Sequence, residues 1–341
     1  MSSTSSLPQA DYTYLILPFT ELTFTNPSSL LPLISKTIHA TKRSLLVIFS
    51  SPSNEQLYAT LRRDPRASWH GFQRFLGQVY GALAAAQWDA GKVLLDIEVA
   101  FEGADVHWSE PSKDGERQTV KLEGKSVAVA KLIAGYENLP MSRDLQDLVS
   151  TSTTVPLCPP IPSTSFSSPD IRPGLPVVAL GGTFDHLHAA HKLLLHLALF
   201  LTTRRLIVGV MSDKLLASKS NADLVEPLDV RIANVEAFVQ RIGGGDIMDV
   251  LEIHDPLGPT GYEADIQALV VSRETESGGT MVNRVREERG LGRLEMFVID
   301  VIAWSPEKGD LSCERDEVRL KDLKMGSTGV RQWIRDHQTD S

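Results

Sequence analysis

The sequence predicts an α/β protein in which a doubly wound, parallel, five-stranded domain follows a smaller α/β domain. In the second half of the chain, short apolar runs alternate with segments of helical spacing, which is typical of a parallel sheet covered by helices. A stretch rich in Pro, Ser and Thr separates that half from the residues before it. The length of 341 residues also fits two domains, at about 150 residues each.

The first half predicts a small α/β domain over 12–148, after a Ser-rich tail at 1–11 that we expect to be disordered. We find no catalytic motif in it, so its role stays open. A polar segment at 103–125 predicts a loop or hairpin. The expected strands are Tyr12–Phe19, Ser44–Ser50 and Lys92–Phe101, and the expected helices are Leu30–Ala40, His70–Asp89 and Val127–Tyr136.

Residues 149–174 predict an interdomain linker. The segment contains six prolines between 156 and 173, and proline interrupts regular backbone pairing. We therefore expect the second domain to begin at 175 and to extend to 341. A fragment of residues 170–341 is expected to fold and to keep its activity alone.

The second domain predicts five strands separated by helices. In such sheets, ligands bind at the carboxyl ends of the strands, near a switch point. The segments 181–191, 212–219, 272–279 and 325–328 follow these elements and should converge there. The expected strands are Pro176–Leu180, Arg205–Met211, Asp249–His254, Ala268–Ser272 and Glu295–Ile302, and the expected helices are His188–Thr202, Glu226–Ile242, Gly278–Gly290 and Ser327–Asp336.

The segment 177–192 carries the strongest motif. An apolar run predicts a buried strand, and we expect Gly181 and Gly182 to end it in a tight turn. A helix should begin at about His188. His188 and His191 are three residues apart, so their side chains should leave the same face of the first turn. The free amides and the dipole at a helix N-terminus favour anions, which indicates a phosphate site.

The run Gly-Gly-Thr-Phe-Asp-His-Leu-His-Ala-Ala-His-Lys resembles the HxGH nucleotidyltransferase superfamily, and most of all the phosphopantetheine adenylyltransferases of eukaryotes and archaea. Ala190 stands where a glycine is usual. The resemblance covers 175–338 and implies a Rossmann-like nucleotidyltransferase domain. It implies catalytic roles for His188, His191 and Lys219, and substrate or ATP contacts by Gly181, Gly182, Thr183, Phe184 and Asp185.

Four further segments resemble the same family. Residues 271–286 match V-S-x-E-T-x-x-G-G-x-x-x-N-x-x-R, and residues 325–331 resemble S-S-T-x-x-R, with Gly326 where a serine is common. A lysine-containing loop follows the second strand, and an arginine opens the next helix. The resemblance implies further substrate or ATP contacts by Ser272, Glu274, Thr275, Asn283, Arg286, Ser327, Thr328, Lys214 and Arg231.

The implied activity is transfer of AMP from ATP to 4'-phosphopantetheine, with Mg²⁺ bridging the ATP phosphates and no metal site of the protein itself. ATP and 4'-phosphopantetheine are then the partners, together with contacts to other coenzyme A pathway enzymes. Two alternatives remain open. One is another nucleotidyltransferase of the superfamily, such as a cytidylyltransferase or a nicotinamide-mononucleotide adenylyltransferase. The other is a non-catalytic assembly protein with a relict nucleotide site.

The composition excludes several other classes. A formal net charge of -9 argues against a general nucleic-acid-binding protein. Two distant cysteines predict reduced thiols. No apolar run approaches the ~20 residues of a membrane span, and the N-terminus has no secretory or mitochondrial signature, so we expect a cytoplasmic protein without a membrane partner. The sequence contains no G-x-x-x-x-G-K-[ST] run, so we expect no P-loop kinase module.

Overall fold

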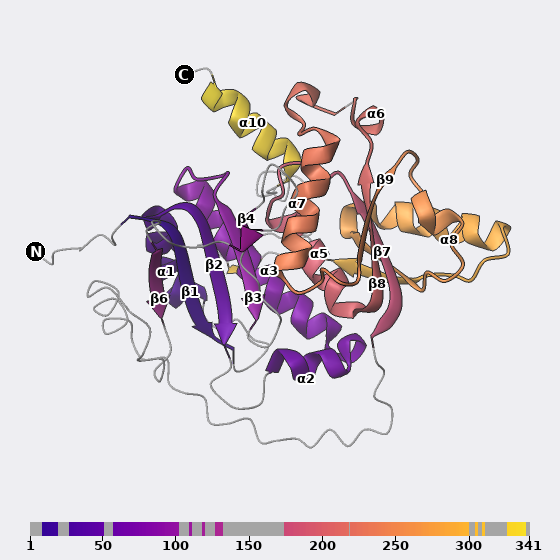
Figure 1. The fold of residues 1–341 in the computed structure, drawn as a ribbon, viewed down its shortest axis with the longest axis horizontal. Helices are drawn as coiled ribbons and strands as arrows, with labels where there is room; N and C mark the ends of the chain where they lie inside the picture. The colour runs from indigo at the N-terminus through magenta and orange to yellow at the C-terminus, as the bar shows by residue number, and fades with distance from the viewer. Residues whose placement is uncertain are drawn as a thin grey trace, which may run out of the picture.

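Each half of the chain builds one parallel sheet (Figure 1). The computed structural model describes residues 9–19, 27–50, 57–101, 109–110, 118–119, 127–131, 174–217, 219–299, 304–305, 309–310 and 326–338. The expectations for the tail and for the linker fall almost entirely outside these residues. The proposed boundaries between tail, domains and linker therefore stay predictions.

The N-terminal sheet has the strand order β3-β2-β1-β6, with every pair parallel. The expected helix at Val127–Tyr136 is wrong in its described part, because Val127–Lys131 is a strand that pairs with β1. Val127 and Val129 alternate with alanines there, and β-branched residues at every second position favour a strand. The expected 103–125 hairpin contains the antiparallel pair β4 (Ser109–Glu110) and β5 (Gln118–Thr119). The other elements are β1 (Ala10–Pro18), α1 (Pro27–Ala40), β2 (Thr41–Ser50), α2 (Leu57–Arg63), α3 (Pro65–Asp89), β3 (Asp96–Phe101) and β6 (Val127–Lys131).

The C-terminal sheet confirms the five predicted strands and their parallel pairing. Its order is β11-β10-β7-β8-β9, so the chain runs outward from β7 to one edge and returns on the other side of β7. The switch point therefore lies between β7 and β10. Its elements are β7 (Leu175–Gly182), α5 (Ala189–Leu201), β8 (Thr202–Met211), α6 (Asp213–Leu216), α7 (Leu228–Arg241), β9 (Met248–Ile253), β10 (Ala268–Ser272), α8 (Glu276–Glu288), β11 (Glu295–Ile299), β12 (Trp304–Ser305), β13 (Gly309–Asp310) and α10 (Ser327–Gln338).

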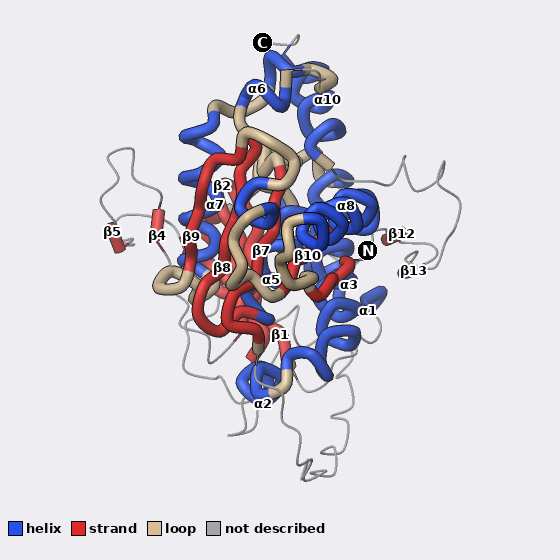
Figure 2. The backbone as a smooth tube through the Cα atoms, turned by 90° about the vertical axis from the view of Figure 1, so that its right-hand side faces the viewer, coloured by secondary structure: helices blue, strands red, loops and turns tan. Residues whose placement is uncertain are grey.

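Helices cover both faces of this sheet, as the doubly wound prediction requires (Figure 2). Alternate residues of a strand point to opposite faces. Val178 and Leu180 of β7 belong to the core cluster that contains α5 and α7. Val177 and Ala179 belong to a second cluster, to which Val282 of α8 contributes. Both faces are thus apolar, which explains why the strands read as continuous hydrophobic runs.

The two halves share one hydrophobic core. Helix α3 of the N-terminal half lies between its own sheet and α5 of the C-terminal half (Figure 1). The rings of Phe72 and Phe200 have centroids 4.3 Å apart, and those of Trp69 and Phe297 are 4.9 Å apart. A fragment of residues 170–341 would expose Phe200 and Phe297 to water. This packing does not support the expectation that the fragment folds alone.

His196 is buried in that shared core, with 2% of its surface exposed, and its ring lies edge-on to Phe101 at 5.5 Å. Burial, with a smaller contribution from nearby Arg62, lowers its pKa to about 3. In the unfolded chain the pKa returns to about 6.5, so below that pH the unfolded state binds a proton that the folded state does not.

We therefore predict that stability falls as the pH drops from about 6.5 towards 3, by about 1.4 kcal/mol per pH unit from His196 alone. Urea unfolding at pH 7, 6, 5 and 4 measures this dependence. In the variant His196→Leu, the free energy of unfolding should depend less steeply on pH, because one group that binds a proton on unfolding is gone. An unchanged slope in the variant would show that the dependence arises elsewhere.

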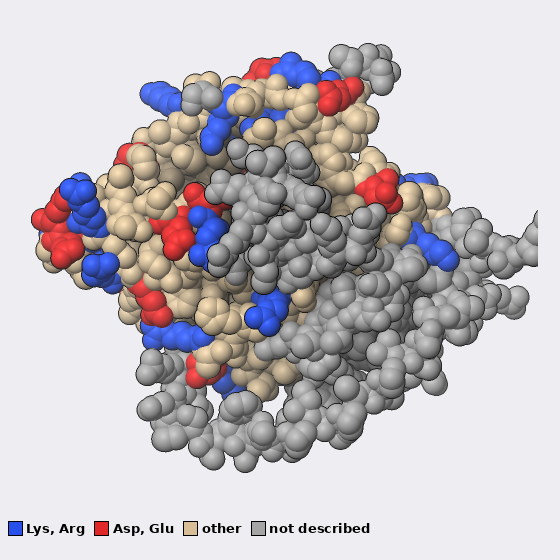
Figure 3. All heavy atoms as spheres, turned by 180° about the vertical axis from the view of Figure 1, so that it is seen from behind, with Lys and Arg blue, Asp and Glu red and all other residues tan. Residues whose placement is uncertain are grey.

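On the face shown in Figure 3, acidic and basic side chains are interspersed. No helix among the described residues is both long enough and apolar enough to cross a membrane.

Candidate active site

The loop after β7 turns at two non-glycine residues. The tight turn that we expect at Gly181 and Gly182 is wrong, because both residues still belong to strand β7. The positive φ angles belong to Phe184, at 49°, and His186, at 44°. Left-handed backbone is strained for such residues, and it persists where surrounding contacts fix it. Gly182 is needed for packing, because a Cβ there would lie 3.1 Å from the ring of Phe184.

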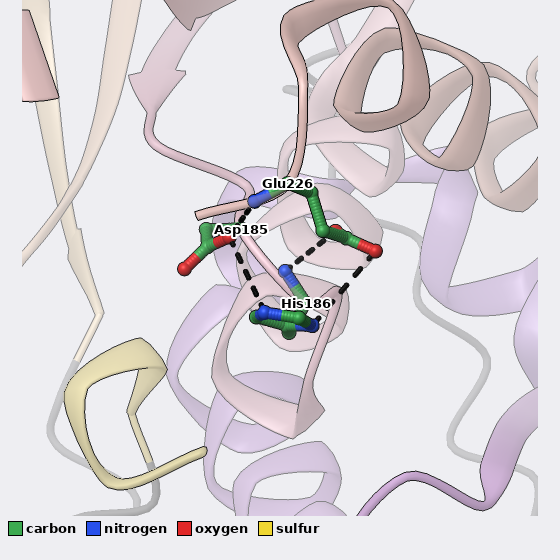
Figure 4. Close-up of side chains that lie close together, drawn as sticks. All are labelled: Asp185, His186 and Glu226. Carbon is green, nitrogen blue, oxygen red and sulfur yellow. Dashed lines mark hydrogen bonds and ion pairs between the residues drawn. The ribbon is translucent and has the colours of Figure 1, made fainter. Parts of the chain in front are cut away.

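Hydrogen bonds from Glu226, before α7, hold this loop in place (Figure 4). The backbone N–H of His186 donates to Glu226 Oε2 at 2.7 Å. The backbone N–H of Glu226 donates to Asp185 Oδ1 at 2.9 Å, and Asp185 is completely buried. The other carboxylate oxygen of Asp185 pairs with Arg331 of α10. The strained turn is therefore fixed from two sides, and both carboxylate oxygens of Asp185 are engaged within the protein.

Asp185, His186 and Glu226 also form a group whose ligand atoms lie within 4.8 Å of one another. Their atoms are already engaged: His186 Nε2 lies 2.8 Å from the carbonyl oxygen of Leu224, and both Asp185 oxygens have partners. A metal ion would have to displace these hydrogen bonds. We therefore interpret the group as a set of hydrogen bonds that holds the loop after β7, rather than as a metal site.

His188 and His191 form a stacked pair at the start of α5. Helix α5 begins at Ala189 with His188 as its N-cap residue, which confirms the predicted start. The two rings are 3.9 Å apart with an interplanar angle of 22°, so both leave one face, as predicted. His188 Nε2 lies 3.2 Å from Ser327 Oγ, and that hydroxyl donates to the carbonyl oxygen of Asp185 at 3.3 Å. The N-terminus of α10 is thereby joined to the N-terminus of α5.

Both histidines are neutral at pH 7. Burial, followed by the charges of His186, Lys192 and Arg331, lowers the pKa of His188 to about 3. Burial and then His188 lower the pKa of His191 well below its ordinary value. The Nδ1 atoms of both rings are shielded from solvent and have no hydrogen-bond partner within the described residues. A neutral imidazole offers one N–H donor and one acceptor.

The carboxyl end of β10 lies beside β7, so the second motif joins the first across the switch point. Ser272 and Thr275 form a capping box that starts a short 3-10 turn before α8. Glu274 and Thr275 are exposed and Ser272 is half-buried. The structure thus brings the exposed start of the second motif to the same sheet edge as Thr183, which is half-buried.

Three residues with expected ATP or substrate contacts are buried and hydrogen-bonded within the protein. Arg286 is fully buried and donates to the carbonyl oxygens of Gly292, Thr260 and Glu263. Arg231 is fully buried and bonds the carbonyl oxygens of Glu226, Thr183 and Met211 together with Asp213. Asn283 bonds the N–H and C=O of Leu294. Arg286 Nη2 is buried without a hydrogen-bond partner among the described residues, but the other donors are engaged within the protein, and we leave the three residues out of the proposed site.

Phe184, which also has an expected contact with ATP or substrate, packs behind His191. It is fully buried, and its ring lies 5.2 Å from that of His191. The side chain is not exposed, and a contact of Phe184 with ATP or substrate stays a prediction.

Lys214 and Lys219 lie where a phosphate could reach them. Lys214 is in α6, directly after β8, and Lys219 follows that helix. Both side chains are exposed, and neither has an ion-pair partner among the described residues. The exposed Thr328 and the half-buried Ser327 stand at the start of α10.

Sequence reasoning missed Arg331 and Glu226 as organisers of the site. Arg331 is the last residue of the S-S-T-x-x-R block, and it pairs with Asp185, 146 residues earlier. The arginine was visible in the motif, but its partner is set by the tertiary structure. Glu226 gave no sequence signal beyond its place before a predicted helix.

Known proteins resemble this chain in its C-terminal half. The sequence model of the Cytidylyltransferase-like family matches residues 179–312. A phosphopantetheine adenylyltransferase of Saccharomyces cerevisiae is 42% identical over 133 residues, which cover 39% of this chain and 44% of that protein. An uncharacterized protein of Schizosaccharomyces pombe is 39% identical over 46% of this chain and 47% of its own length. A phosphopantetheine adenylyltransferase of Thermococcus gammatolerans is 37% identical over 37% of this chain and 77% of its own length. The matched part thus spans about half the length of the two yeast relatives.

Proposed function

Because the chain belongs to the phosphopantetheine adenylyltransferase family, we propose that it transfers AMP from ATP to 4'-phosphopantetheine, giving dephospho-coenzyme A and pyrophosphate. The observation that carries this proposal is the contact between His188 and Ser327. It joins two helix N-termini at the carboxyl end of β7. Each N-terminus presents unpaired amides and a positive dipole end, which together favour a polyphosphate.

The proposed reaction is an in-line displacement at the α-phosphorus of ATP. An oxygen of the acceptor phosphate forms the new P–O bond, and pyrophosphate leaves with the electrons of the broken bond. The acceptor phosphate is ionised at neutral pH, so no strong general base is required. The protein then contributes positioning and charge stabilisation.

The histidines, lysines and hydroxyl groups of the site each have a role in the proposed reaction. His191, being neutral, donates an N–H group to a phosphate oxygen without repelling Mg²⁺, and His188 does the same once a phosphate replaces Ser327 Oγ at its Nε2. Lys219, with Lys214 beside it, supplies positive charge to the acceptor phosphate. Ser327, Thr328, Thr183 and the segment Ser272–Thr275 bind the nucleotide. Mg²⁺ enters with ATP as part of the substrate.

A panel of substrate pairs tests the proposal. Pyrophosphate release should be fastest with ATP and 4'-phosphopantetheine, and should fall without Mg²⁺. CTP with a phosphorylated alcohol, and ATP with nicotinamide mononucleotide, are the competing pairs, and preference for either would replace the proposal. Release with none would favour a relict site. A cytoplasmic location and contacts with other coenzyme A pathway enzymes stay predictions, which imaging and co-purification of the tagged full-length chain would test.

Lys219 gives a prediction for the acceptor side. Lys219→Ala should raise the Michaelis constant for 4'-phosphopantetheine and lower turnover, because it removes a charge from the acceptor phosphate. Lys214→Ala, a matched exposed lysine five residues earlier, should have the smaller effect. Steady-state kinetics with each substrate varied measures both. If Lys214→Ala is crippling and Lys219→Ala is silent, the two roles are exchanged.

A further inference from the structure

Lys192 connects the motif helix to the N-terminal half. It follows His191 directly in the first turn of α5, and its side chain is 4% exposed. Its Nζ donates to Asp96 Oδ1 at 2.5 Å and to the carbonyl oxygen of Ile97 at 2.9 Å. Both partners belong to β3, a strand of the N-terminal sheet. The helix that carries the two histidines is thus tied to the other half of the chain.

The tie depends on the charge of Asp96. A buried ammonium group is costly unless an opposite charge and hydrogen bonds compensate it. Burial raises the pKa of Asp96, but Lys192 and Arg241 more than offset that effect and hold the pKa below its ordinary value. The carboxylate is therefore ionised at neutral pH and neutralises Lys192. Without it, Lys192 would have to move towards water and take the first turn of α5 with it.

Water is within reach on one side of this pair. A cavity of about 390 Å³ lies between the two halves and is lined by Asp96, Lys192 and His188, with further residues of α3 and α7. The side chain of Asp96 is 44% exposed. If Lys192 lost its ion-pair partner, its ammonium group could move into this cavity, which His188 also lines.

We propose that Asp96 is a positioning residue for catalysis, which fixes the stacked pair of His188 and His191 through Lys192. The proposal deepens the proposed function and rests on it, and it gives the N-terminal half a task. None of the described residues of that half is assigned a reacting role, and the half sets the geometry of the groups that react.

The variant Asp96→Asn removes the charge and keeps the shape. We expect kcat to fall by about tenfold to a hundredfold, because a displacement of about 1 Å in a catalytic group has effects of that size. The Michaelis constant for ATP should stay within about threefold, since Ser327, Thr328 and the second motif still bind the nucleotide. The double variant Asp96→Asn with Lys192→Met removes both charges and should restore most of the lost turnover.

Glu98→Gln is the matched control. Glu98 also lies in β3, is 2% exposed, and accepts from Arg241 Nε at 2.6 Å, so it too ties the halves together. Arg241, the last residue of α7, also lies 3.9 Å from Asp96 Oδ2, so Glu98 belongs to the same charge network as Asp96. Glu98→Gln should lower the melting temperature as much as Asp96→Asn and leave kcat within about twofold, because the hydrogen bonds of Lys192 to Asp96 and Ile97 remain.

A second measurement separates this inference from the proposed function. In protein labelled with ¹⁵N-histidine, the imidazole signals of His188 and His191 should shift in Asp96→Asn and stay in place in Glu98→Gln. If the wild type transfers no adenylyl group, the proposed function fails and these signals still test the tie. Unchanged signals and kcat in Asp96→Asn, or equal losses of kcat in both variants, would overturn the inference.

Discussion

His191→Ala should abolish most of the activity while the protein stays folded. The ring of His191 stacks on His188 at 3.9 Å and rests against buried Phe184, so it is held at the edge where the phosphates are proposed to bind. A donor that acts mainly in the transition state affects turnover more than substrate binding. Its loss typically costs ~10²–10³ in rate, or roughly 3–4 kcal/mol. Affinity for ATP should stay within about tenfold.

His196→Ala provides the control, because His196 lies in the same helix, is buried, and faces the shared core instead of the site. It should lose stability and keep near-normal turnover in its folded fraction. Melting temperature, ATP affinity and turnover are measured on the same preparation of each variant. A soluble His191→Ala protein with more than about a tenth of wild-type turnover would remove His191 from the mechanism.

Arg331→Met should give the largest loss of stability. Arg331 is 3% exposed and its partner Asp185 is completely buried, so the substitution leaves a carboxylate without its counter-charge. Breaking a buried pair in this way costs about 3–5 kcal/mol, which is a large share of the ~5–15 kcal/mol that stabilises a typical domain. Helix α10 should detach from the loop after β7, and activity should fall with it because Ser327 is carried away.

Arg335 of the same helix is the matched control. It pairs with Asp223 at 2.5 Å, and the two side chains are 43% and 62% exposed, respectively. Arg335→Met should cost at most about 1 kcal/mol, because water screens an exposed pair. The double variant Arg331→Met with Asp185→Asn should recover part of the loss. Urea unfolding measures all three. Equal costs for the two arginines would show that the Asp185 pair does not hold α10.

The periodicity of the chain was enough to predict the C-terminal sheet. Strands such as Ala268–Ser272 are buried on both faces and bounded by polar segments, so local sequence and tertiary position agree. Val127–Lys131 was mispredicted because its alanines favour a helix while its alternating valines favour a strand. Only the neighbouring strand β1, more than 100 residues earlier, decides between them.

The motif predicted the histidine pair, but not what holds it. His188 and His191 are close in sequence, and helical geometry alone places their rings together. The partners of Arg286 and Arg231 are backbone carbonyl groups of distant loops, which no residue pattern announces. For that reason, the sequence could not show that the arginines with expected phosphate contacts are buried and bonded within the protein. The ties from Lys192 to Asp96 and from Arg331 to Asp185 likewise connect residues about 100 positions or more apart.

The central claim is tested most directly by a single-turnover reaction. Enzyme in excess over ATP labelled at the α-phosphate is mixed with 4'-phosphopantetheine and Mg²⁺, and the labelled products are separated. The account predicts that the label passes into dephospho-coenzyme A in step with pyrophosphate release, and that His191→Ala binds ATP but transfers almost none of it. Label that stays in ATP, or that passes equally well in His191→Ala, would contradict it.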